Sequence, residues 1–221
     1  MSKDQEIIEA VAAYDSKKQN QQYPIVDSLS LLHDILLGNP DNCKQAAYTP
    51  KVLISLIKLS LCKHIKDFDR EEKKETDKVR NFSLCCLQEI QRLGDLSVQY
   101  DLIEKGYIRA LIHAASLCGG SSMQNDIWVF VKLQSTFQIY RDLNDGRIQQ
   151  TFNQKFASFA PQSYLTDCVK DQIELEGGNE EVDALIFNIG WFNKVKDIAS
   201  NLKYFLTVTG KDCTNREWDQ F

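Results

Sequence analysis

The chain has 221 residues, a formal net charge of -5 and 43% hydrophobic residues. This length suits one substantial domain or an elongated array of small units, and the hydrophobic fraction argues against general disorder. The mild acidity gives no electrostatic basis for binding nucleic acid, and no apolar stretch reaches the ~20 residues of a membrane span. We therefore expect neither a nucleic-acid partner nor membrane insertion.

The sequence of the first third of the chain predicts four successive helices. Residues 2–14 have the capping residues and the apolar spacing of an amphipathic helix. Pro24 suits the first turn of the next helix, and Gly38 is a plausible left-handed stop for it. Asn39–Pro40 and Thr49–Pro50 each have the sequence of a capped helix start.

The helix that starts after Pro50 is expected to reach about Lys66, where a strongly charged stretch begins. Residues 66–78 carry charges of both signs and almost no apolar side chains, which is typical of a solvated helix extension or loop. A docking segment is the alternative. Residues 79–118 then show helical apolar patterns on both sides of the hinge-like Gly106.

The second half of the chain is rich in aromatic residues. Residues 127–143 resume helical spacing, and a turn is expected at Gly146. A stripe with spacings of four, four and three follows and is expected to be helical core: Ile148, Phe152, Phe156 and Phe159. Pro161 opens another helix. Residues 179–210 predict one long final helix, which could bend at Gly190.

The sequence repeats itself at a period of roughly 40 residues, within the range of helical solenoids. Residues 26–37, VDSLSLLHDILL, parallel residues 79–90, VRNFSLCCLQEI. Each copy continues through a polar break and a short helix to a hinge, Pro50 or Gly106, and then to another helix. Residues 127–169 offer a more divergent third copy.

Three of these stretches carry a family resemblance. Residues 39–60, NPDNCKQAAYTPKVLISLIKLS, resemble the short helix, hinge and amphipathic helix of the armadillo repeat. Residues 102–116, LIEKGYIRALIHAAS, resemble the hinge of the armadillo repeat, and VRNFSLCCLQEI resembles its third helix. The resemblance implies an all-α protein, a right-handed α-solenoid of armadillo-like repeats closed by a long C-terminal helix. The single domain would be 1–221, with repeats at about 24–66, 78–120 and 126–176 and a capping helix at about 179–210.

The resemblance also implies a concave surface, lined by the third helices, for extended peptides or partner proteins. Peptide-binding members of the family place a Trp there and, one turn later, an Asn. The aligned pairs in this chain are Leu32 and Leu36, Cys85 and Glu89, and Ser135 and Ile139. Because no Trp–Asn ladder is present, recognition of basic import signals is disfavoured. A groove with Leu32, Leu36 and Ile139 would instead suit a helix or other apolar contacts.

A second surface is expected in the aromatic half of the chain. As one component of a larger assembly, the protein would bury these side chains against a partner: Trp128, Phe130, Trp191 and Phe192.

Residues capable of catalysis or metal binding do not form a recognisable motif. The histidines, His33, His64 and His113, are interpreted as structural or surface residues, and the seven cysteines have neither disulfide-framework nor zinc-site spacing. They are expected to act as small hydrophobes in a reducing, cytoplasmic compartment, the nucleus or a cilium being alternatives. No phosphate-binding loop follows a strand, and no nucleophile elbow is present.

The sequence therefore predicts a non-enzymatic scaffold, adaptor or structural subunit that binds partner proteins, without a cofactor or metal. Two other functions stay open. One is a regulator or co-chaperone that clamps a GTPase or a chaperone ATPase domain. The other is a small helical enzyme or metal protein.

Overall fold

The computed structural model describes Ile8, Val11 and residues 25–62, 70–116, 123–148, 156–187 and 193–208. These residues are all-helical apart from turns and one isolated bridge, which confirms the all-α part of the predicted fold class. The helices are α2 (Ile25–Leu36), α3 (Pro40–Tyr48), α4 (Val52–Ser60), α5 (Arg70–Leu93), α6 (Leu96–Glu104), α7 (Tyr107–Ser116), α8 (Met123–Asp145), α9 (Ser163–Leu175), α10 (Gly178–Phe187) and α11 (Asn193–Val208).

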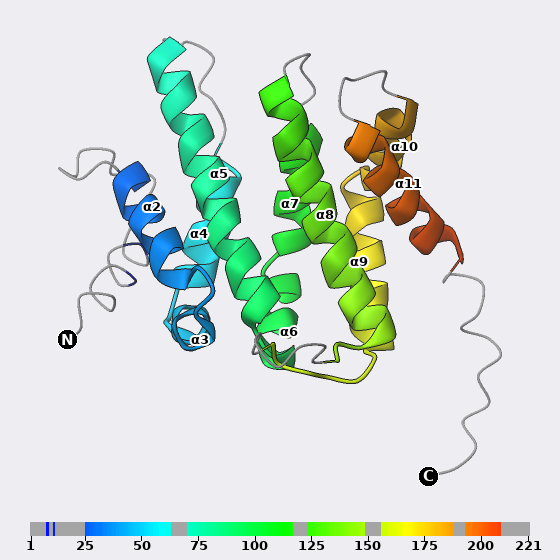
Figure 1. Cartoon of the computed structure of the whole chain (residues 1–221), viewed down its shortest axis with the longest axis horizontal. Coiled ribbons are helices and arrows are strands. Elements are labelled where there is room, and N and C mark those ends of the chain that lie inside the picture. Colours follow the sequence, from blue (N-terminus) through cyan, green and yellow to red (C-terminus); the bar gives the residue numbers. More distant parts are fainter. Residues whose placement is uncertain are drawn as a thin grey trace.

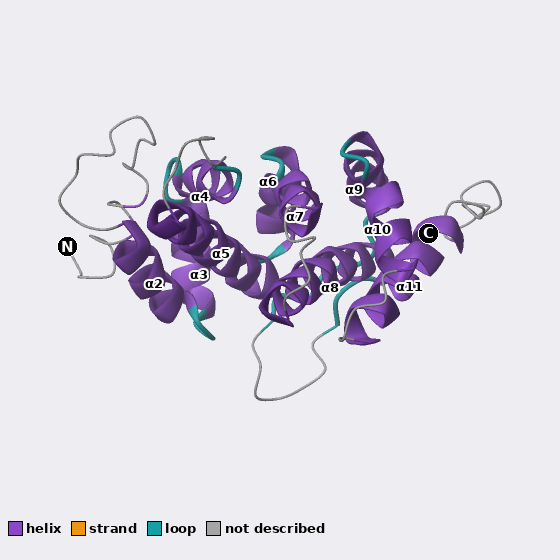
Figure 2. Ribbon diagram, turned by 90° about the horizontal axis from the view of Figure 1, so that it is seen from above, coloured by secondary structure: helices purple, strands orange, loops and turns teal. Residues whose placement is uncertain are grey.

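The helices form two layers. Helices α2, α5, α8 and α11 lie side by side in the front layer of Figure 1, and α4, α7 and α9 lie behind them. Figure 2 shows the same two rows from above. The order of one helix, a hinge, a second helix and a front-layer helix occurs three times, as α3–α5, α6–α8 and α9–α11.

The three hinges share one backbone feature. Lys51, Gly106 and Gly177 have φ angles of 70°, 89° and 68°, in the left-handed region. Each of them lies between the first and second helices of its unit. The hinge of the first unit is therefore Lys51 and not Pro50, one residue later than predicted.

Lys51→Gly is expected to raise the free energy of unfolding by about 0.5–1 kcal/mol. The native left-handed conformation costs a residue with a Cβ about 1–2 kcal/mol, and the larger unfolded-state entropy of glycine offsets part of that gain. Gly106→Ala is the mirror-image control, because its φ is 89° and a Cβ there would meet nothing within 4 Å. In urea unfolding, the midpoint should rise for Lys51→Gly and fall for Gly106→Ala. Shifts of both midpoints in the same direction would contradict this account.

The predicted long helix over 179–210 is wrong. The chain forms two helices there, α10 and α11, which pack closely against each other and enclose a small core with α8. This core is built from Val129, Leu133, Val182, Leu185, Val195, Ile198, Ala199 and Leu202. Residues 188–192, between α10 and α11, lie outside the described residues.

The aromatic stripe is not a helix in its described part. Gly146, with φ 80°, follows the end of α8, and Arg147 then pairs with Phe159 in the isolated bridge, with N–O distances of 2.8 and 3.0 Å. The side chain of Ile148 is 76% exposed, whereas Phe156 and Phe159 pack partly buried against the main core. Phe152 lies outside the described residues. The four-, four- and three-residue spacing therefore does not correspond to a helix at Ile148, Phe156 or Phe159.

Other predicted boundaries agree with the structure more closely. Helix α2 ends before Gly38, and the side chain of Asn39 caps α3 by accepting a hydrogen bond from the Asn42 backbone at 3.1 Å. The charged stretch is partly a helix extension, since α5 begins at Arg70. Helix α4 is shorter than predicted and ends at Ser60.

The front layer is not packed uniformly. Helix α2 packs along α5, and α8 packs along α11, but α5 and α8 do not pack closely along their described lengths. Helix α7 contacts both of them from the back layer. This separation in the middle of the front layer provides space for a surface cleft.

Candidate functional site

The apolar residues predicted to line a groove are in the core. Leu32, Leu36 and Ile139 are each 0% exposed. Leu32 and Leu36 belong to the face of α2 that is buried in the main core, so they cannot contact a partner in this conformation. The lining of any groove must come from a different face of these helices.

The other predicted contact residues have varied surroundings. Cys85 and Glu89 are half-buried, and Glu89 is held by Arg92 at 2.6 Å. Ser135 is 2% exposed and donates a hydrogen bond from Oγ to the Val131 carbonyl at 2.9 Å. Trp191 and Phe192 lie outside the described residues, whereas Trp128 and Phe130 are half-buried.

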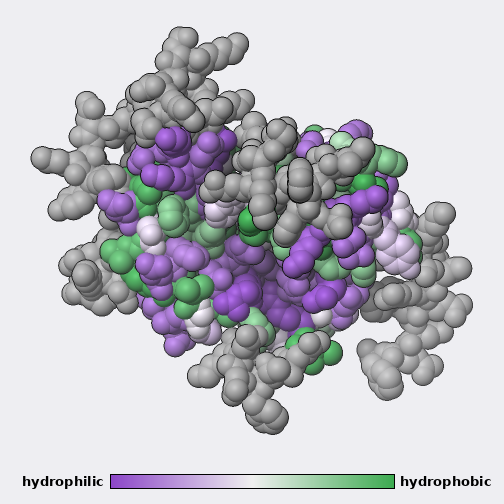
Figure 3. Space-filling view, turned by 45° about the horizontal axis from the view of Figure 1, so that its top comes forward, coloured by the Kyte–Doolittle hydropathy of each residue, from purple (hydrophilic) through white to green (hydrophobic). Residues whose placement is uncertain are grey.

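A cleft of about 670 Å³ separates α5 from α8. Figure 3 shows hydrophilic side chains gathered in a hollow across the middle of the molecule. The lining comes from both helices and from the connection after α8: Gln88, Gln91, Arg92, Gln134, Ser135, Gln138, Arg141, Asp142, Asp145, Gly146, Arg147, Ile148 and Phe156. Of the predicted contact residues that the structure describes, only Ser135 is part of it.

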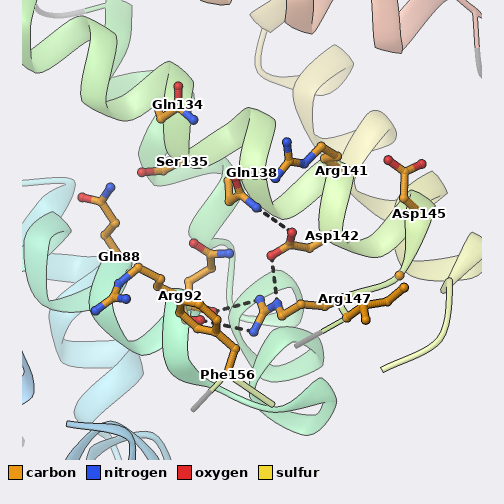
Figure 4. Close-up of a pocket in the computed structure, with 13 residues that line it drawn as sticks. Gln88, Arg92, Gln134, Ser135, Gln138, Arg141, Asp142, Asp145, Arg147 and Phe156 are labelled. Carbon is orange, nitrogen blue, oxygen red and sulfur yellow. Dashed lines mark hydrogen bonds and ion pairs between the residues drawn. The ribbon is translucent and has the colours of Figure 1, made fainter. Parts of the chain in front are cut away.

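On one side of the cleft, Arg147 is held by a set of hydrogen bonds and an ion pair, which Figure 4 shows as dashed lines. The Arg147 guanidinium donates from Nε to Asp142 at 2.9 Å, and Gln138 donates to the other oxygen of the same carboxylate at 2.6 Å. The remaining Arg147 nitrogens donate to three α5-end carbonyls, those of Gln91, Arg92 and Gly94, at 3.2, 3.3 and 2.9 Å. We call these groups the Arg147 network.

The Arg147 network connects the two helices across the base of the cleft. Arg147 is only 7% exposed, and burial lowers the pKa of its guanidinium while the Asp142 carboxylate raises it. Its positive charge lies at the carbonyl end of α5, where the helix dipole favours a cation. The guanidinium also stacks 4.8 Å from the centre of the Phe159 ring. All these contacts restrain α8 relative to α5.

The opposite part of the cleft has side-chain amides that make no hydrogen bond to the described residues. Gln88 on α5 and Gln134 on α8 are half-buried, and neither side chain makes a hydrogen bond to the described part of the chain. Figure 4 shows them on opposite walls. Nε2 of Gln91, a residue that is 1% exposed, also has no hydrogen-bond partner among the described residues. An amide offers two donors and an acceptor oxygen, so these side chains suit a ligand with both donors and acceptors.

The charged side chains of the cleft differ in whether a side chain of opposite charge lies next to them. Arg92 is paired with Glu89 and lies 5.6 Å from the centre of the Phe156 ring. Arg141 is exposed, donates to Gln138 at 3.3 Å, and has no carboxylate of the described residues within ion-pair distance. Asp145 is exposed at the same rim and accepts only from the Asn144 side chain, at 2.7 Å, among the described residues.

Two of the described cysteines are poorly placed for nucleophilic chemistry. Cys43 and Cys86 are fully buried, and burial raises the pKa of Cys43 to about 12 and that of Cys86 well above its usual value. At neutral pH both are therefore thiols and not thiolates. His33 and His113 are half-buried, while His64 lies outside the described residues. No three His, Cys, Asp or Glu side chains converge as metal ligands within the described ranges.

Comparison with protein-family models, curated proteins and solved structures gave no match. Among the described helices, none is long and apolar enough to cross a membrane. The cleft must therefore be interpreted from its own residues. Its sequence signal was a polar stripe on α8 with spacings of four, three and four: Gln134, Gln138, Arg141 and Asp145. The sequence analysis followed apolar stripes and missed it.

Proposed function

We propose that this protein is a non-enzymatic adaptor or structural subunit that holds a segment of a partner protein in the cleft between α5 and α8. The observation that carries the proposal is the pair of unengaged amides, Gln88 and Gln134, on opposite walls of the cleft. An extended polypeptide presents N–H and C=O groups on both of its edges, and a glutamine side chain can pair with either group.

The dimensions of the cleft support an extended segment. Its lining on α8 runs from Gln134 to Asp145, over which an α-helix rises about 16 Å. An extended chain covers that length in about five residues, at roughly 3.3 Å each. The lining on α5 is shorter, from Gln88 to Arg92, so the long axis of the cleft follows α8.

We also propose that the helices form an armadillo-like right-handed solenoid. The three helix–hinge–helix units, with their left-handed residues at Lys51, Gly106 and Gly177, support that architecture. A reducing compartment such as the cytoplasm is proposed because the described cysteines are free thiols, two of them completely buried.

The double variant Gln88→Ala/Gln134→Ala tests the binding function. Loss of two hydrogen-bonding groups, at about 0.5–1.5 kcal/mol each, is expected to weaken partner retention by roughly 10- to 100-fold. Affinity purification of the full chain followed by quantitative mass spectrometry measures this. The half-exposed positions of both glutamines predict an unchanged unfolding midpoint.

The matched control is Gln45→Ala/Gln162→Ala, which removes two glutamines outside the cleft. Proteins retained by the wild type and the control but lost by the cleft variant would be partners of the cleft. If all three chains retain the same proteins equally, the cleft is not the binding site.

A further inference from the structure

The rim of the cleft carries two charges of opposite sign on one face of α8, neither of which has an ionic partner among the described residues. Arg141 also lies 5.9 Å from the centre of the Phe137 ring. Arg141 and Asp145 are both exposed cleft-lining residues, four positions apart. They are not paired with each other, and Figure 4 shows the Arg141 guanidinium near Gln138 and the Asp145 carboxylate standing apart. By contrast, the buried charges of the same cleft, Arg147 and Asp142, neutralise each other at 2.9 Å.

The spacing of the two rim charges matches the repeat of an extended chain. Four helical positions correspond to a rise of about 6 Å. Two residues of an extended strand span about 6.6 Å, and their side chains point to the same side. A segment lying along α8 can therefore place one side chain at Arg141 and the next-but-one side chain at Asp145.

We infer that Arg141 and Asp145 select a partner segment that carries an acidic and a basic residue two positions apart. The inference rests on the proposed function and adds its ligand class: an extended segment whose acidic side chain pairs with Arg141 and whose basic side chain pairs with Asp145. The amides of Gln88 and Gln134 hold the main chain, and the rim charges set its register and direction. A segment of uniform charge would attract one rim residue and repel the other.

A charge exchange tests this assignment. A displayed library of random peptides is selected on the full-length wild-type chain and on the variant Arg141→Asp/Asp145→Arg. Peptides selected on the wild type are expected to carry an acidic and a basic residue two positions apart in one order along the chain. Peptides selected on the variant are expected to carry them in the opposite order. Wild-type-selected peptides should bind the variant at least about tenfold more weakly, and the difference should shrink at high salt because both charges are exposed.

The matched control is Asp101→Lys/Lys105→Asp, a pair with the same spacing at the C-terminal end of α6, whose side chains lie 3.0 Å apart and do not line the cleft. This control should select the wild-type peptides. Peptides that compete for the cleft but are the same for the wild type and the Arg141/Asp145 variant would overturn the inference and leave the binding function standing. A library that yields no binder sensitive to Gln88→Ala/Gln134→Ala would overturn both. Self-association abolished by the Arg141/Asp145 exchange would also overturn the inference, by making a second copy the occupant.

Discussion

Arg147→Met is expected to lower the free energy of unfolding by about 3–5 kcal/mol, because it removes one partner of a buried ion pair. Asp142 is 8% exposed and, among the described residues, its side chain would keep only the hydrogen bond from Gln138. The carbonyls of Gln91 and Gly94 would also lose a charged donor at the end of α5. Methionine preserves most of the side-chain volume, so the effect reports the lost charge and hydrogen bonds.

Urea unfolding of the full chain, followed by circular dichroism, measures this loss. Arg141→Met is the matched control: the same substitution at an exposed position six residues earlier should change stability by no more than about 0.5 kcal/mol. Adding Asp142→Asn to Arg147→Met should recover part of the loss, because the uncompensated charge is removed. If Arg147→Met is no more destabilising than Arg141→Met, the Arg147 network does not hold α5 and α8 together.

Local sequence signals were sufficient for most of the helices. Asn39 and Pro40 mark the start of α3 through capping chemistry that needs no distant partner. Left-handed glycines, such as Gly38 after α2 and Gly146 after α8, mark helix ends in the same way. Lys51 was missed as a hinge because a lysine gives no local signal for a positive φ, which the surrounding helices impose.

The candidate site could not be found by the same reasoning. Leu32 and Leu36 were assigned to a surface through the family alignment, although their own three-and-four spacing with Leu29 is that of a buried face. Arg147 reaches backbone carbonyls 53 to 56 residues earlier in the chain, and no sequence pattern specifies a pairing at that distance. Tertiary packing, including the contacts of α7 with both α5 and α8, brings these groups together.

Gly146 forms the turn that positions Arg147. Gly146→Ala is expected to lower the free energy of unfolding by about 2–5 kcal/mol. A φ of 80° costs an alanine about 1–2 kcal/mol. The new Cβ would also lie 2.9 Å from Cδ of Pro161 and 3.0 Å from the Phe159 carbonyl oxygen. Relieving these contacts requires backbone movement at the Arg147–Phe159 bridge, which adds about 1–3 kcal/mol.

Gly38→Ala separates the two contributions. Its φ is 68°, but a Cβ there meets nothing within 4 Å, so only the conformational cost of about 1–2 kcal/mol is expected. The excess loss for Gly146→Ala over Gly38→Ala, measured by urea unfolding, then reports the contact with Pro161 and Phe159. When Arg147→Met is also present, the difference in lost unfolding free energy between Gly146→Ala and Gly38→Ala should be smaller. The turn then no longer positions a charge that connects α8 to α5. Full additivity of the two substitutions would show that Gly146 acts independently of the Arg147 network.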